Sequence, residues 1–105
     1  MSQRESRLSL KIQQALRARG WFCFKVHGNE YMMAGLPDLI ACAEGVFVGL
    51  ETKHPETRED VSPRQAYVHS KIQQAGGTAV VVCSPAEAVR AVEKALVDMY
   101  GEEEE

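Results

Sequence analysis

Hydrophobic residues recur along the chain with periods that predict three helices and four strands. Helical spacing of apolar residues is found over residues 3–19, 62–75 and from 84 onward. Apolar runs of strand length, alternating or continuous, cover residues 21–27, 39–43, 46–50 and 78–83. The predicted order of elements is therefore α-β-β-β-α-β-α.

The connections between these elements predict an α/β fold with a mixed sheet. The runs 39–43 and 46–50 are neighbours in sequence and predict an antiparallel hairpin. The strand-to-helix-to-strand step through residues 62–83 predicts a right-handed crossover between parallel strands. The continuous apolar run 78–83 is typical of a strand covered on both faces. We expect a mixed sheet with helices on both faces.

Capping residues mark where the later helices begin and end. Ser62-Pro63-Arg64-Gln65 has the N-cap serine, first-turn proline and third-position glutamine of a capping box, and Ser84-Pro85-Ala86-Glu87 repeats the arrangement with glutamate. Gly20 and Gly76-Gly77 follow helical runs and predict their ends.

The predicted hairpin brings two carboxylates and a lysine to one end. Glu44-Gly45 separates the two apolar runs and predicts a two-residue β-turn. A two-residue turn sets a pairing register in which Asp38 lies opposite Glu51, with Cβ atoms about 4.5–5.5 Å apart. Lys53, two residues beyond Glu51, lies on the same face.

Two directly opposed carboxylates repel one another unless a cation lies between them. Mg²⁺ takes one or two carboxylates together with water and phosphate oxygens, and a lysine beside it can stabilise a charged phosphorus centre. The alternative is that Asp38 and Glu51 are solvated strand ends, with Glu51 and Lys53 as a weak surface ion pair. A one-residue bulge would also break this pairing.

Length and composition predict one domain. The chain has 105 residues, 45% of them hydrophobic, which is a globular composition. We expect a single domain over residues 1–101 and a disordered acidic tail over 102–105. Three widely spaced cysteines inside apolar runs predict buried free thiols in a reducing compartment. No signal peptide or membrane-length apolar run is present, so we expect a cytoplasmic protein without a membrane partner.

The negative net charge does not exclude a nucleic-acid partner, because the charges are unevenly distributed. The four glutamates at 102–105 contribute −4 to a net charge of −3, so the rest of the chain carries +1. Six basic residues and one acid lie within residues 1–25. Arg4, Arg7 and Lys11 form one row of the first helix, which either contacts a phosphate backbone or is a solvated helix face.

Several candidate residues have two interpretations. Glu5, on the apolar stripe of the first helix, either completes the acidic site or pairs with the helix dipole. Gln65 either faces the charged end of the hairpin or serves as the capping partner of Ser62. His27 can assist a site or hydrogen-bond at a strand end. The apolar residues 31–33 either pack down or form an exposed patch that meets DNA or a second subunit.

The order of these motifs resembles a known nuclease superfamily. Gly35-Leu36-Pro37-Asp38, then Glu51-Thr52-Lys53, then Gln65 is similar to the PD-(D/E)xK nucleases. The Gly-x-Pro-Asp start, the Ser-Pro-x-Gln helix opening and the Gly-Gly before the next strand most resemble its VRR-NUC branch, the virus-type replication-repair nucleases. The resemblance covers nearly the whole chain and implies a restriction-endonuclease-like fold.

The resemblance also implies site roles. Asp38 and Glu51 would bind the metal together with the main-chain carbonyl of Thr52. Lys53 would orient or activate the attacking water, Glu5 would complete the site from the first helix, and Gln65 would lie near the metal. The implied DNA-contacting residues are basic side chains: Arg4, Arg7, Lys11 and Arg64.

The predicted function is that of an endodeoxyribonuclease dependent on Mg²⁺ or Mn²⁺. The resemblance implies a standalone minimal member that acts as a homodimer on branched DNA, with a four-way (Holliday) junction as the preferred substrate. Its setting would be DNA repair, recombination or phage replication, in a bacterial or phage-encoded protein. The alternatives are a non-catalytic DNA-binding module and a protein-interaction module with the same fold.

Overall fold

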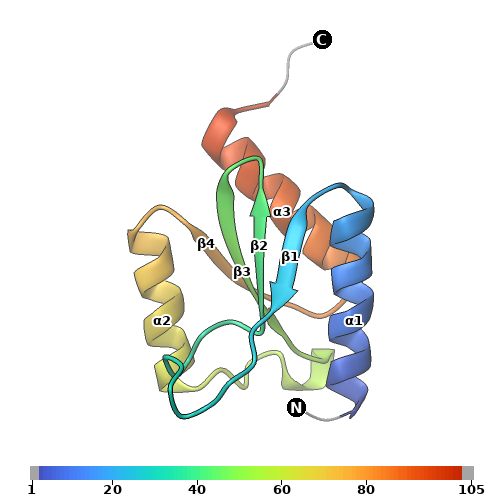
Figure 1. Ribbon diagram of the computed structural model, residues 1–105. Helices are drawn as coiled ribbons and strands as arrows, with labels where there is room; N and C mark the ends of the chain where they lie inside the picture. Colours follow the sequence, from blue (N-terminus) through green and yellow to red (C-terminus); the bar gives the residue numbers. More distant parts are fainter. Residues whose placement is uncertain (1–2, 103–105) are drawn as a thin grey trace.

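The computed structural model describes residues 3–102 and confirms the predicted order of elements (Figure 1). The elements are α1 (Gln3–Ala18), β1 (Phe22–Lys25), β2 (Leu39–Ala43), β3 (Val46–Thr52), α2 (Pro63–Gln74), β4 (Thr78–Val82) and α3 (Pro85–Tyr100). A short 3₁₀ turn, η1 (Pro55–Thr57), lies in the loop before α2. Most of the expected acidic tail, residues 103–105, lies outside the described residues.

The four described strands form one mixed sheet in the order β1-β2-β3-β4. β1 pairs with β2 and β2 with β3 in antiparallel fashion, whereas β3 and β4 are parallel. The hairpin register runs from Ala43 opposite Val46 to Leu39 opposite Leu50, as the two-residue turn predicts. Glu44 and Gly45 both have positive φ, 49° and 84°, which is the backbone geometry of a type I′ turn.

Helices pack on both faces of the sheet, as predicted, but they do not cover it equally. α1 and α3 pack against each other and over one face. The core on that side is formed by side chains of both helices and of the sheet, among them Ile12, Leu16, Val48, Leu50 and Val92. Burying an aliphatic side chain of this size contributes about 1.5–3 kcal/mol, so this face contributes most of the apolar stabilisation.

The opposite face is covered by α2 only near β3 and β4, leaving β1 and β2 open in Figure 1. Phe22, Phe24 and Phe47 remain 67%, 45% and 43% exposed there. All three cysteines are free thiols, and Cys23 is buried as expected. The expectation that Cys42 is buried is wrong, because its side chain lies on the open face, and Cys83 is only partly buried.

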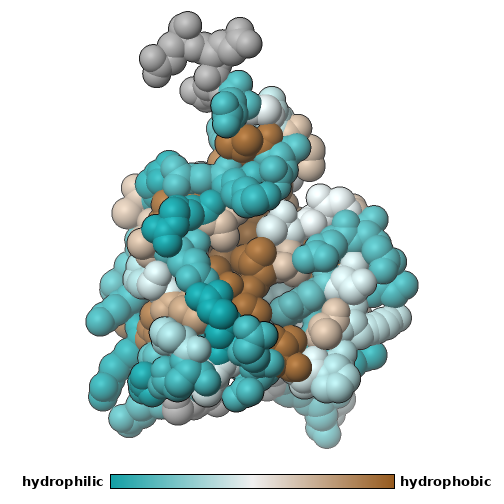
Figure 2. Space-filling view, turned by 180° about the vertical axis from the view of Figure 1, so that it is seen from behind, coloured by the Kyte–Doolittle hydropathy of each residue, from teal (hydrophilic) through white to brown (hydrophobic). Residues whose placement is uncertain are grey.

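The far side of the molecule is mostly hydrophilic, with apolar residues gathered in a band along its middle (Figure 2). Among residues 3–102, no helix is long and apolar enough to cross a membrane.

Two close backbone approaches fix the loop that leads into β2. A Cβ added at Gly49 in β3 would lie 2.6 Å from Cγ of Pro37, so only glycine admits the proline ring. A Cβ added at Gly35 would lie 2.7 Å from the carbonyl oxygen of Arg64 in α2, and Gly35 has φ of +87°. Pro37, the residue before Asp38, therefore packs directly against β3.

Candidate metal centre

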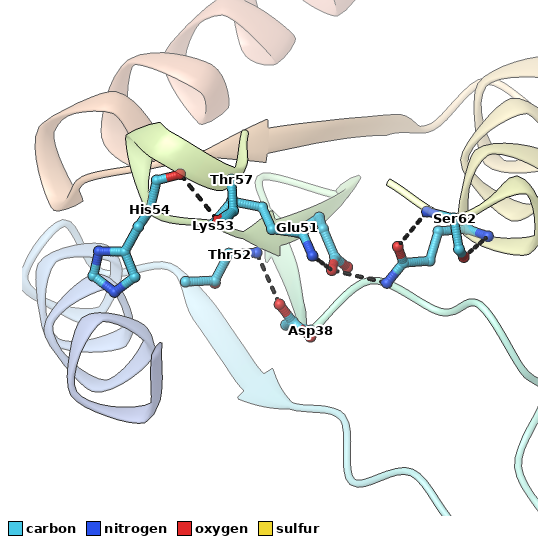
Figure 3. Close-up of polar contacts among 8 residues, drawn as sticks. Asp38, Glu51, Thr52, Lys53, His54, Thr57 and Ser62 are labelled. Atoms are coloured by element: carbon cyan, nitrogen blue, oxygen red, sulfur yellow. Dashed lines mark hydrogen bonds and ion pairs between the residues drawn. The ribbon is translucent and has the colours of Figure 1, made fainter. Parts of the chain in front are cut away.

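Asp38 and Glu51 lie at the same end of the hairpin, as the register predicts (Figure 3). Asp38 directly precedes β2, and Glu51 is the penultimate residue of β3. The main-chain N–H of Thr52 donates a hydrogen bond to Oδ2 of Asp38 over 2.8 Å, across the two strands. The Asp38 carboxylate is therefore held by the backbone of the strand that carries Glu51.

The Glu51 side chain is almost completely buried, with the residue 2% exposed. Its Oε2 accepts a hydrogen bond from Nε2 of Gln65 over 2.9 Å and lies 3.9 Å from Nζ of Lys53. Its Oε1 is also buried and has no hydrogen-bond partner among the described residues. A buried carboxylate oxygen without a partner is costly, and a bound cation would supply what it lacks.

The electrostatics of the pair favour a cation. Burial, and after it the negative charge of Asp38, raise the pKa of Glu51 to about 7, against the opposing effects of Lys53 and of the hydrogen bond from Gln65. Burial likewise raises the pKa of Asp38, against the hydrogen bond from Thr52 and the positive charge of Lys53. Two carboxyl groups in this state are difficult to ionise together unless another positive charge is present.

Gln65 is both the capping partner of Ser62 and a contact of the charged end of the hairpin. Ser62 Oγ accepts from the main-chain N–H of Gln65 over 3.1 Å, and Gln65 Oε1 accepts from the N–H of Ser62 over 3.0 Å, which completes the capping box. The amide nitrogen of the same Gln65 side chain contacts Glu51. The start of α2 is thus fixed by the residue that orients the buried carboxylate.

Glu5 lies in the first turn of α1, where its charge contributes to raising the pKa of Asp38. Among the described residues, however, no three His, Cys, Asp or Glu side chains gather closely enough to hold a metal ion. The carboxylate set in this structure is therefore the pair Asp38 and Glu51, with Glu5 nearby.

The predicted DNA-contacting residues lie on exposed surface. Arg7 and Lys11 are exposed along α1, and Arg4 pairs with Glu56 of η1. The Nε–H of Arg64 donates to the carbonyl oxygen of Ala34 over 3.2 Å, so this arginine also helps to hold the loop before β2.

His69 is a member of this cluster that the sequence analysis missed. It lies one helical turn after Gln65 on α2, is 8% exposed, and has a buried Nε2 without a hydrogen-bond partner among the described residues. Burial lowers its pKa, and the charge of Asp38 opposes that shift. The available signal was the spacing of four from Gln65, which places both side chains on one helix face.

The donor set fits a hard divalent cation. Two carboxylates, one with an unpartnered oxygen, offer the oxygen ligands that Mg²⁺ and Mn²⁺ prefer. The main-chain carbonyl of Thr52 stays a predicted ligand. Lys53, whose side chain is largely buried, supplies a fixed positive charge beside the pair.

Comparison with known proteins supports the predicted fold. No model of a known protein family matches the sequence, and no curated protein sequence matches it. The structure is similar to a solved structure described as a VRR_NUC domain, with a TM-score of 0.70 and 24% sequence identity, over 88% of this chain and 97% of that one. The fold of this chain is that of a VRR_NUC domain, which confirms the predicted resemblance at the level of fold.

Proposed function

We propose that this chain, with its VRR_NUC fold, is an endonuclease that hydrolyses DNA phosphodiester bonds with Mg²⁺ or Mn²⁺. The observation that carries the proposal is the Asp38–Glu51 pair, in which Glu51 is buried, with Lys53 beside it and one Glu51 oxygen without a hydrogen-bond partner among residues 3–102. A purely structural pair of this kind would cost stability, because the contacts from Thr52, Gln65 and Lys53 leave one buried oxygen unsatisfied. A binding role for a cation and a phosphate accounts for it.

Each residue has a distinct task in the proposed site. When bound, the cation would lower the pKa of water and neutralise charge on the phosphate oxygens. Asp38, Glu51 and the carbonyl of Thr52 would hold it. Gln65 orients the Glu51 carboxylate, and the ammonium group of Lys53 would add positive charge near the oxygens of the reacting phosphate, where negative charge develops. Glu5 would approach from α1 to complete the acidic set.

Binding of the DNA backbone is assigned to exposed basic residues, namely Arg4, Arg7, Lys11 and Arg64. Contacts of this kind give salt-dependent affinity that is largely independent of sequence, so selection by DNA shape is favoured over base reading. We further propose that the substrate is branched DNA, including four-way junctions, and that the protein acts as a homodimer.

The test is cleavage of plasmid DNA and of a panel of duplex, flap, splayed and four-way substrates with Mg²⁺, Mn²⁺ or EDTA. The wild-type protein should cut only with a cation, and Lys53→Ala should not cut. Lys94→Ala is the matched control, because Lys94 lies on α3 and pairs with the exposed Asp98. Calorimetric titration with Mn²⁺ should show binding that Asp38→Asn abolishes.

Two results would contradict the proposal. Cleavage that survives in both Lys53→Ala and Asp38→Asn would assign the activity to another site or a contaminant. A wild-type protein that binds DNA but neither binds Mn²⁺ nor cuts would favour the non-catalytic DNA-binding module instead.

A further inference from the structure

A small cavity adjoins the proposed metal centre. It has a volume of about 230 Å³ and is lined by residues of the segment 26–38 between β1 and β2, with Asp38 as part of its wall. Val26, Met32, Leu36 and Pro37 contribute apolar surface to the wall. A ligand in this cavity would therefore be directly beside one of the two proposed metal ligands.

We propose that the cavity takes an unpaired nucleobase of the DNA substrate, from a nucleotide next to the phosphate held at Asp38. This inference rests on the proposed nuclease function and specifies its substrate: DNA in which a base near the cleaved bond is unpaired. It assigns a role to the loop residues that the metal centre does not use.

The size of the cavity matches one ring system rather than a whole nucleotide. Pockets for drug-sized ligands have volumes of about 300–1,000 Å³, so 230 Å³ is enough for a smaller planar group. The remaining sugar and phosphate would lie outside, toward Asp38. A base that is stacked and paired in a duplex cannot enter, because it must first leave the stack.

The chemistry of the wall also suits a base. The thioether group of Met32 and the aliphatic side chain of Val26 offer apolar contact to a ring face. Asn29 adds a polar group: its Oδ1 accepts from the N–H of Tyr31 over 2.8 Å, which leaves the amide nitrogen as a donor toward a base edge.

The loop that lines the cavity exposes large apolar side chains. Tyr31, Met32 and Met33 are 89%, 43% and 61% exposed, so the structure answers the question that the sequence left open: these side chains do not pack into the core. Arg64 holds the same loop against α2 through the carbonyl of Ala34 and stacks 5.3 Å from the ring centre of Tyr67. The positively charged guanidinium group of Arg64 is thus held near an apolar surface on which unstacked bases can pack.

The experiment measures binding of 2-aminopurine DNA in Ca²⁺, with the probe either unpaired in a one-nucleotide bulge or paired in the matched duplex. The wild-type protein should bind the bulge at least about tenfold more tightly and change the probe's fluorescence. Gly28 lines the cavity, and a Cβ there meets no heavy atom within 4 Å, so Gly28→Leu adds a bulky side chain at the cavity wall without a backbone clash. It should remove both effects while leaving duplex binding and Mn²⁺ affinity unchanged.

A second cavity variant distinguishes loss of the base site from misfolding of the loop. Met33→Ala should weaken the bulge preference, whereas Met99→Ala, at a 52% exposed methionine on α3, should behave as wild type. No bulge preference in the wild type, or one that Gly28→Leu leaves intact, would overturn the inference. If plasmid cleavage and Mn²⁺ binding are nevertheless present, only this inference fails. If plasmid cleavage and Mn²⁺ binding are absent while the cavity variants still change the probe's response, the base-binding site is supported and the nuclease proposal is contradicted.

Discussion

Glu51 makes the metal-free protein less stable as the pH rises. A solvated glutamate has a pKa of about 4.5, whereas the pKa of Glu51 in the fold is about 7. The folded state therefore holds its proton more tightly, and the free energy of unfolding decreases as the pH rises from about 4.5 through about 7. Above that range the full difference applies, which is about 3 kcal/mol.

The substitution Glu51→Gln removes this penalty while keeping the shape of the side chain. The amide also ends the charge repulsion that Asp38 exerts on Glu51. In EDTA at pH 8, we expect the variant to be more stable than wild type by up to about 3 kcal/mol, and the gap should shrink toward pH 4.5. Urea unfolding followed by circular dichroism at several pH values measures both quantities.

Added Mn²⁺ should reverse the order. The wild-type protein should gain stability at pH 8 in proportion to RT ln(1 + [Mn²⁺]/Kd), and the variant should gain little because one ligand has lost its charge. Glu93→Gln is the control: Glu93 is half exposed and pairs with Arg19, so its loss should cost less than about 1 kcal/mol. A Glu51→Gln protein no more stable than wild type in EDTA at pH 8 would refute the reasoning.

Three further substitutions test the surroundings of the site. Gly49→Ala places a Cβ 2.6 Å from the ring of Pro37, so we expect a loss of about 1–3 kcal/mol in urea unfolding and weaker Mn²⁺ binding by calorimetry; wild-type values for both would contradict the packing argument. His69→Leu removes an unpartnered buried nitrogen, so stability in the same assay should hold or rise while Mn²⁺ affinity falls about tenfold; unchanged affinity would reduce His69 to a packing residue. Arg58→Ala breaks a partly exposed 2.7 Å pair with Glu87 and should cost less than about 1 kcal/mol by thermal unfolding, with a larger loss indicating that the η1 loop depends on it.

The hairpin could be predicted from sequence because local chemistry determines it. Glu44-Gly45 accepts positive φ at both turn positions, and this fixes which residues face each other down to Asp38 and Glu51. Ser62 and Gln65 likewise determine the start of α2 by their own hydrogen bonds. These signals need no knowledge of the rest of the fold.

Other features depend on how distant elements pack. The alternation at Phe22 and Phe24 predicts two faces of β1, but only the placement of α2 over β3 and β4 leaves the phenylalanine face open. His69 escaped notice because a helix of this length has several partly apolar faces, and the one toward Asp38 depends on the crossing of α2 over the sheet. The position of Glu5 depends in the same way on where α1 lies.

The hydrogen bond from Thr52 to Asp38 has a consequence for how the site forms. Its donor is main chain, while the Thr52 side chain points to the other face of β3 and is completely buried. No side-chain exchange at position 52 can delete this donor, except proline. The two acids are therefore brought together by the same strand pairing that builds the sheet, so the capacity to bind a cation should appear in a single step with the fold and vanish with it.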